Sequence, residues 1–225
     1  MLHYGKIGEW IEKLGFATEQ EVTTALALQW GCPVARSFDP SAIPSPVIPL
    51  PILEAFQMLP LNYASATDTL YIAFGERVDH AALYAIEKIL NCRTQPCVAG
   101  RKNIARQLDL MRQLPRPSDV EFGPMDDLAE MGRIAASYTT RLTPGQVRLS
   151  RIGRFIWLRL DARMRAGTSA PSVSSPQLLA SPAARTSPAP RSIPTNLVFR
   201  LATDSARVIP IIMDCHPERS RDFTK

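Results

Sequence analysis

The chain has 225 residues, of which 45% are hydrophobic and 21% are charged, and its formal net charge is +5. A hydrophobic share of this size is enough for a folded core, so the composition excludes a wholly disordered chain. The charge is divided unevenly: residues 1–140 hold 12 Lys and Arg against 16 Asp and Glu, whereas residues 141–225 hold 14 against 5. The first region is typical of an acidic folded domain, and the second is a basic extension of the kind that attracts acidic partners or nucleic acids.

The four cysteines, Cys32, Cys92, Cys97 and Cys215, form no Cys-x-x-Cys pair and have no second pair nearby. We therefore expect neither a metal site nor a disulfide. The N-terminus lacks the charged start and apolar run of an export signal, and no stretch approaches 18 uninterrupted apolar residues. These features predict a cytoplasmic protein without a membrane span.

Residues 1–33 are predicted to form a helical hairpin. Apolar residues at helical spacing over 7–14 indicate the first helix, and Gly15 follows as a left-handed stop. Thr18 then opens the sequence Thr-Glu-Gln-Glu, a capping box in which Glu21 can reach back to the Thr18 amide. The second helix should end before the glycine and proline that close this segment.

Residues 34–114 are predicted to form a small α/β subdomain that begins with a proline-broken stretch. Its expected elements, in chain order, are a short helix at 52–57, strands at 58–64 and 69–74, a helix capped by Asp79, a strand at 94–99 and a helix carrying Ile104, Leu108 and Met111. The resulting β-β-α-β-α order indicates that helices cover one face of a sheet.

The next segment is expected to be a linker at residues 115–125, because its start is rich in proline and polar residues. Residues 126–160 are predicted to form a helix followed by a β-hairpin around Gly153. The acidic residues Asp126 and Asp127 stand at the expected helix start, where negative charge favours the helix dipole.

The last segments differ in composition from everything before them. Residues 168–194 are Pro, Ser or Ala at 18 of 27 positions, so they are predicted to be a disordered linker. Residues 195–213 should contain a returning strand, Asn196–Leu201, that pairs with the preceding hairpin, and residues 214–225 resemble translated repetitive DNA and are expected to be a tail without function. The predicted fold class is therefore α+β, with a helical hairpin, a small α/β subdomain, and a helix plus β-like extension.

Residues 6–29 carry the most informative pattern. They read Lys-Ile-Gly-Glu-Trp-Ile-Glu-Lys-Leu-Gly-Phe-Ala-Thr-Glu-Gln-Glu-Val-Thr-Thr-Ala-Leu-Ala-Leu-Gln. This run resembles the motif of the MshEN family, the GspE N-terminal domains of type II secretion and type IV pilus ATPases. The positions that match the motif are Lys6, Ile7, Gly8, Ile11, Gly15, Val22, Leu26 and Gln29. Glu12 departs from the motif, which has an aliphatic residue there.

The resemblance covers residues 5–113, because the Gln-x-Gly-x-Pro exit at 29–33 and the order of the α/β elements also match. It implies a hairpin beside a small α/β subdomain. It also implies a non-enzymatic docking function, in which the partner is a secretion or pilus ATPase or an inner-membrane platform protein.

In the family, two tandem motifs wrap one cyclic di-GMP molecule, so the resemblance further implies that the eight matching positions bind this ligand. Backbone amides beside a glycine can approach a phosphate, and aliphatic side chains can form a dry floor for guanine. Only one motif is found here, and Lys6 replaces an arginine whose planar fork suits guanine. One motif alone predicts binding in about the millimolar range.

We find no Gly-x-x-x-x-Gly-Lys-Ser/Thr loop and no catalytic set of side chains, so we expect no enzymatic activity. Asp79 and His80 are explained by the start of a helix. Three alternatives to docking stay open: a cyclic di-GMP sensor completed by dimerisation, a nucleic-acid-binding adaptor that uses the basic residues 141–225, and a truncated gene product that has lost an upstream motif.

Overall fold

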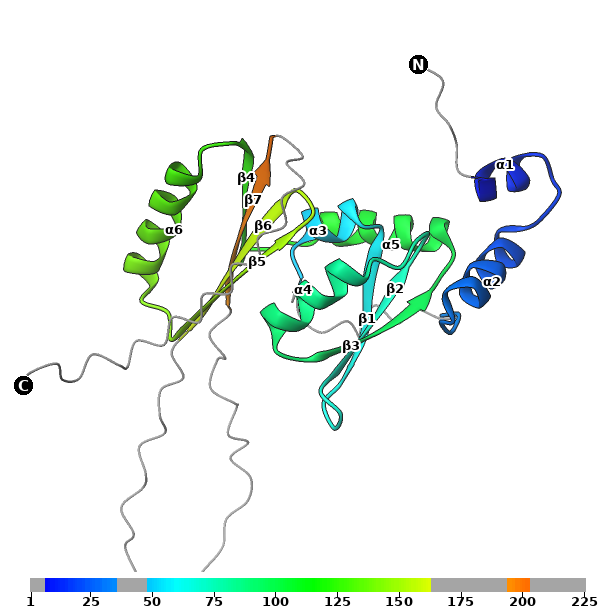
Figure 1. Cartoon of the computed structure of the whole chain (residues 1–225), viewed down its shortest axis with the longest axis horizontal. Coiled ribbons are helices and arrows are strands. Elements are labelled where there is room, and N and C mark those ends of the chain that lie inside the picture. Colours follow the sequence, from blue (N-terminus) through cyan, green and yellow to red (C-terminus); the bar gives the residue numbers. More distant parts are fainter. Residues whose placement is uncertain (1–6, 36–47, 163–193, 203–225) are drawn as a thin grey trace, which may run out of the picture.

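A computed structural model of the chain describes residues 7–35, 48–162 and 194–202 (Figure 1). These residues contain six helices and seven strands, and the strands form two sheets. The predicted α+β class is confirmed. Figure 1 shows a helical hairpin at the N-terminal end, then the α/β subdomain, and then the second sheet on the opposite side of that subdomain.

The hairpin consists of α1 (Ile7–Lys13) and α2 (Glu19–Trp30). Gly15 lies in the connection with φ 73°, a conformation that favours glycine. The Thr18 hydroxyl accepts the backbone N–H of Glu21, and the backbone N–H of Thr18 donates to the Glu21 carboxylate at 2.7 Å. The predicted capping box is therefore confirmed.

The α/β subdomain contains, in chain order, α3 (Leu50–Ala55), β1 (Met58–Ala64), β2 (Thr69–Phe74), α4 (His80–Leu90), β3 (Arg93–Val98) and α5 (Arg101–Gln113). β2 is the central strand; it pairs antiparallel with β1 and parallel with β3. Asp79 caps α4, because its carboxylate accepts the backbone N–H of Ala82 at 2.9 Å. The predicted β-β-α-β-α order and this cap are confirmed. Ile72, Phe74 and Ile86 are fully buried in the core of the subdomain.

The second layer contains β4 (Asp119–Met125), α6 (Leu128–Leu142), β5 (Gln146–Ile152), β6 (Phe155–Asp161) and β7 (Thr195–Leu201). The order of strands in the sheet is β4-β7-β6-β5. β5 and β6 form the predicted hairpin, with Gly153 at φ 54° between them. β7 pairs antiparallel with β6, as predicted, and parallel with β4.

The prediction of a linker at residues 115–125 is wrong, because β4 occupies most of this segment. Val120 and Phe122 alternate with charged residues, which is the pattern of a strand with one apolar face. Phe122 stacks on Phe199 of β7 at a centroid distance of 4.7 Å. β4 is an edge strand with a register shift before Pro124, and an edge is where a sheet tolerates proline.

Alternate residues of β6 join the second layer to two separate apolar clusters. Phe155 and Trp157 extend the core of the α/β subdomain, whereas Leu158 and Leu160 pack in the cluster that contains residues of α6. This follows from the two-residue period of a strand, which sends successive side chains to opposite faces. The sheet is thus covered on one face by the subdomain and on the other by α6.

A buried polar contact holds three strands of this sheet together. Asn196 of β7 is fully buried and accepts the indole N–H of Trp157 at 3.1 Å. Its amide donates to the carboxylate of Asp119 at 2.8 Å. Because each buried polar atom in this chain of contacts has a partner, the network orders the sheet at little desolvation cost.

Several predictions fall outside the part of the chain that the structure describes. These are the disordered linker at 168–194, of which only Pro194 is described, the end of the region 195–213, and the tail at 214–225. The other predicted domain boundaries stay predictions. Among the described residues, no helix has the length and hydropathy needed to cross a membrane.

Candidate functional site

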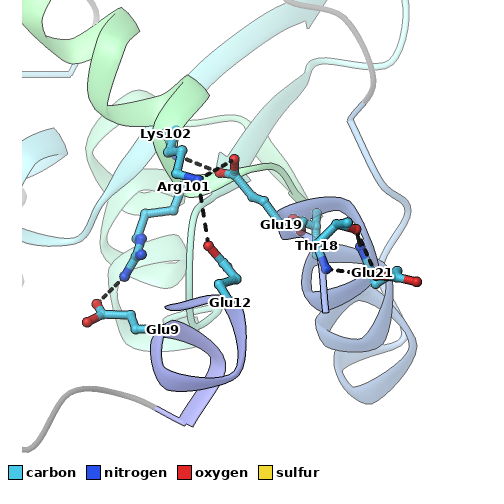
Figure 2. Close-up of polar contacts among 8 residues, drawn as sticks. Glu9, Glu12, Thr18, Glu19, Glu21, Arg101 and Lys102 are labelled. Carbon is cyan, nitrogen blue, oxygen red and sulfur yellow. Dashed lines mark hydrogen bonds and ion pairs between the residues drawn. The ribbon is translucent and has the colours of Figure 1, made fainter. Parts of the chain in front are cut away.

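Helix α1 contacts the rest of the chain through its polar side (Figure 2). The carboxylate of Glu9 pairs with the guanidinium of Arg101, and that of Glu12 lies 3.8 Å from the ammonium of Lys102. On the same side, a Cβ added to Gly8 would come within 3.0 Å of a methyl group of Val22. α1 is therefore attached by ion pairs to α5 and by a close glycine contact to α2.

Three apolar side chains on α1 and directly after it point away from these contacts, whereas Ile11 of the same helix is partly buried. Ile7, Trp10 and Leu14 are 79%, 50% and 63% exposed, whereas the side chains of Glu9 and Glu12 are 28% and 15% exposed. The spacing i, i+3, i+7 places the three apolar residues on one side of the helix, and the backbone N–H of Leu14 still donates to the carbonyl of Trp10. We call these three residues the apolar stripe.

This arrangement is the reverse of the usual one, in which a surface helix buries its apolar side and exposes its charged side. No residue of α1 is buried. The predicted helices are present, but the apolar residues of the first one do not form a core. They are available to contact another molecule.

Helix α2 is attached to the start of α5 by Glu19. The backbone N–H of Lys102 donates to this carboxylate at 2.8 Å, and the ammonium of Lys102 lies 3.7 Å from it. α5 begins after Gly100, which has no side chain to cap the helix. Glu19 supplies that cap from the hairpin, and a Cβ on Gly100 would come within 3.0 Å of it.

The chain that leaves α2 adds to the edge of the first sheet. The backbone N–H of Val98 donates to the carbonyl of Pro33 at 2.9 Å, and the backbone N–H of Ala35 donates to the carbonyl of Val98 at 2.8 Å. On α2 itself, Thr23 and Ala27 are buried. The hairpin is therefore held beside the subdomain by this edge pairing and by Trp30, Cys32 and Ala35, which pack against the core of the subdomain.

A cleft of about 580 Å³ lies between the hairpin and the α/β subdomain. Its hairpin wall includes four of the predicted site residues, which are Gly8, Val22, Leu26 and Gln29. Its opposite wall comes from the end of α3 and from the loop between β2 and α4, with Ala55, Phe56, Gln57, Gly75, Glu76, Arg77 and Asp79. The structure thus brings half of the predicted positions to one surface.

The other four predicted positions lie elsewhere. Ile7 belongs to the apolar stripe, Ile11 is partly buried, and Gly15 is exposed in the turn between the helices. Lys6 lies outside the described residues. Binding of cyclic di-GMP by these residues stays a prediction.

The charged residues of the cleft are the part of the site that sequence reasoning missed. The carboxylates that line it are those of Glu9, Glu12, Glu19, Glu76 and Asp79, and the guanidinium groups are those of Arg77 and Arg101. One signal was present in the sequence: Glu9 and Glu12 have the i, i+3 spacing that places them together on a helix, away from the apolar stripe. Their partners on α5 could not be inferred from this spacing.

The thiols of the subdomain are poor nucleophiles. Burial raises the pKa of Cys97 to about 12 and the pKa of Cys92 to about 11. Both thiols are therefore protonated at neutral pH, and a protonated thiol neither attacks an electrophile nor binds a metal efficiently. Among the described residues, no group of three or more His, Cys, Asp and Glu side chains is placed to hold a metal ion.

No family model and no curated protein matches the chain. Among solved structures, the chain is similar to a structure of MshE with cdg (cyclic di-GMP), at 25% identity and a TM-score of 0.39. The match covers 48% of this chain and 78% of the MshE chain. It is also similar to two structures of the N-terminal domain of XpsE, each at 18% identity, with TM-scores of 0.37 and 0.38. These two matches cover 47% and 48% of this chain and 74% and 77% of the other chains. Both proteins match the MshEN and GspE N-terminal family, the family that residues 6–29 resemble.

Proposed function

We propose that this chain is a docking module of a secretion or pilus machine and that the apolar stripe of α1 contacts its partner protein. One observation carries the proposal: Ile7, Trp10 and Leu14 are exposed, while Glu9 and Glu12 of the same helix face the chain. The kind of partner comes from the resemblance of residues 6–29 to N-terminal domains of secretion and pilus ATPases. It is a platform protein or an ATPase of such a machine.

The apolar stripe has the composition of a protein-binding helix. Burial of an exposed large apolar side chain contributes about 1.5–3 kcal/mol, so three of them supply a large part of a specific interaction. Trp is enriched among the residues that dominate binding energy at protein interfaces, and Trp10 is the middle residue of the stripe. A stripe at i, i+3, i+7 is the pattern of a helix that lies in an apolar groove of its partner.

The proposal is tested by measuring binding of the chain to purified cytoplasmic domains of secretion and pilus components from the same organism. The test variant replaces Ile7, Trp10 and Leu14 by Ser. The control variant replaces Tyr84, Leu110 and Leu114 by Ser, three other exposed large apolar residues on or after α4 and α5. We expect the unchanged chain and the control to bind one of the domains, and the stripe variant not to bind.

Both variants should keep the unfolding midpoint of the unchanged chain, because the replaced side chains are exposed. Equal binding by the stripe variant and the control would contradict the role of the stripe. Failure of the unchanged chain to bind any of the domains would contradict the kind of partner.

Cyclic di-GMP binding is a second candidate, and one observation favours it: four of the eight motif positions line the same cleft. The charge of the cleft opposes it, because five carboxylates and two guanidinium groups line the space that a dianion would enter. Calorimetric titration with cyclic di-GMP tests this candidate. If it is correct, Leu26→Ser inside the cleft abolishes the heat of binding and Leu28→Ser, an exposed position that does not line it, leaves the heat unchanged. No heat at millimolar ligand excludes it.

A further inference from the structure

The cleft between the hairpin and the subdomain is large enough for a short peptide segment and has an apolar surface. Val22, Leu26 and Trp30 of α2 lie on one wall, and Phe56 after α3 lies on the other. Its volume of about 580 Å³ is within the range of about 300–1,000 Å³ that is usual for ligand sites.

The charges around this apolar surface are unbalanced. Five carboxylates and two guanidinium groups line the cleft, and the ammonium of Lys102 lies beside two of the carboxylates, which leaves a formal excess of two negative charges. Arg101 pairs with Glu9, and Arg77 lies 3.3 Å from Asp79. The other two carboxylates that α1 and α2 contribute to the cleft are those of Glu12 and Glu19. Their ion-pair partner is the ammonium of Lys102 and not a guanidinium group.

Lys102 is shared by two of the carboxylates. Its ammonium is 3.8 Å from Glu12 and 3.7 Å from Glu19, and its side chain is mostly exposed (Figure 2). Both distances are longer than those of a well-formed charge-assisted hydrogen bond, which is about 2.7–2.9 Å. Glu19 also accepts the backbone N–H of Lys102 at 2.8 Å, so Glu12 is the less compensated of the two carboxylates, and a further cation beside it is electrostatically favoured.

We propose that the cleft binds a basic segment of the partner protein, in which a Lys or Arg side chain faces the carboxylates and neighbouring apolar side chains contact Val22 and Leu26. This inference rests on the proposed docking function, because the segment belongs to the docked partner. A peptide with a basic and an apolar side chain fits better than an anionic nucleotide, because the lining has an excess of carboxylates beside its apolar residues.

The position of the cleft relative to the apolar stripe supports the same occupant. Gly8, Glu9 and Glu12 of α1 line the cleft, and the stripe lies on another side of the same short helix. A helix with its side chains is about 10–12 Å across. An extended segment of about four residues spans that width, so one partner can contact α1 from both sides.

The inference is tested by NMR titration of the full ¹⁵N-labelled chain with the probe peptide acetyl-Leu-Lys-Leu-amide. The indole N–H signal of Trp30 reports on the cleft, and that of Trp157 in the buried sheet is the internal control. The neutral peptide acetyl-Leu-Gln-Leu-amide separates charge from apolar contact. We expect a saturable shift at Trp30 and not at Trp157, with the Lys peptide binding about fivefold more tightly than the Gln peptide.

Two variants of the chain complete the design. Glu12→Gln should weaken binding of the Lys peptide about three- to fivefold, and Glu130→Gln on α6 should leave it unchanged. Glu76→Gln removes a carboxylate from the opposite wall of the cleft and should weaken binding of the Lys peptide by a similar factor. Because this variant leaves α1 unchanged, it is informative even if Glu12→Gln shifts the hairpin. Equal affinity for the Lys and Gln peptides, or no effect of either cleft variant, would overturn the inference.

The test separates this inference from the docking function itself. The stripe variant should still bind the Lys peptide, because the replaced residues do not line the cleft. If the peptide shows no binding while capture of a machine component still depends on the stripe, the basic segment is wrong and the docking function stands. Tighter binding of cyclic di-GMP than of the Lys peptide at the Trp30 signal overturns the inference in favour of an anionic ligand.

Discussion

The N-terminal hairpin and the C-terminal sheet use the same type of side chain in opposite ways. In the sheet, Trp157 is fully buried and its indole N–H donates to Asn196. In the hairpin, Trp10 is half exposed on a helix whose two glutamates face the chain, and the ammonium of Lys13 lies 5.5 Å from the centre of its ring. The comparison teaches that aromatic content alone does not distinguish a packing residue from a recognition residue. What distinguishes the two is whether the side of the helix or strand that carries the residue packs against the rest of the chain.

The two regions also differ in how they are attached to the subdomain. The sheet shares a continuous apolar core with it, whereas α1 is attached by the ion pairs of Glu9 and Glu12, and α2 by Glu19 together with Trp30, which packs against that core. Exposed ion pairs contribute little and are screened by salt. We therefore expect the hairpin to open locally at a lower free energy than the sheet.

The largest expected effect is that of Trp157→Ala, which should lower the free energy of unfolding by about 3–5 kcal/mol because it leaves a cavity in the shared core. Trp10→Ala should change the free energy of unfolding by no more than about 0.5 kcal/mol, since the side chain lies on the surface. Urea denaturation of the two variants measures both values. A cost at Trp10 comparable to that at Trp157 would show that the stripe is part of a core.

A smaller effect is expected for Asn196→Ala. The substitution leaves the indole N–H of Trp157 and the carboxylate of Asp119 without their partner, which should cost about 1–3 kcal/mol in the free energy of unfolding. Asn103→Ala, an exposed position on α5, is the matched control and should be close to neutral. Equal denaturation midpoints of the two variants would mean that the buried network does not stabilise the sheet.

Glu19→Ala should act on the hairpin and leave the sheet unchanged. Loss of the cap that Glu19 provides to α5 should weaken the attachment by about 1 kcal/mol, which corresponds to amide exchange about fivefold faster in α2 and at the Lys102 amide. Hydrogen exchange read by NMR measures this, with Gln20→Ala as the neighbouring exposed control. Faster exchange in β6 and β7 would contradict the independence of the two regions.

The smallest effect concerns pH. The N–H and hydroxyl of Thr18 donate to the carboxylate of Glu21 and lower its pKa from the ordinary value of 4.5. A lowered pKa means that the contribution to stability is present above the unfolded-state pKa and is lost as pH falls through the folded-state value. As the pH falls, amide exchange in α2 should therefore accelerate more in the unchanged chain than in the Glu21→Gln variant, because the glutamine side chain does not titrate. Identical pH profiles would exclude the contribution.

Much of the fold was predictable because its signals are local. The Thr18–Glu21 capping box, the Asp79 cap and the turn at Gly153 each depend on residues within a few positions of one another, and all three are confirmed. β4 was missed because its pairing partner β7 lies more than seventy positions away, and a proline-rich start obscured its alternation. Long-range pairing of this kind leaves no local signal.

The candidate site was predictable only in part, for a similar reason. Helical spacing showed that α1 has an apolar and a polar side, but it did not show which side faces the chain. Arg101 and Lys102 on α5 decide this, and the link between Glu9 and Arg101 spans 92 positions in the sequence. The four motif positions that line the cleft were identified from the pattern, whereas the excess of carboxylates required the fold.

Hydroxyl-radical footprinting with mass spectrometry tests the central claim most directly, because it reports the solvent accessibility of each Trp separately. In the free chain, Trp10 should be oxidised several times faster than Trp157, and binding of a cytoplasmic domain that recognises the chain should protect Trp10 selectively. Oxidation of Trp10 in the free chain as slow as that of Trp157 would show that α1 turns its apolar side inward, and would contradict the account.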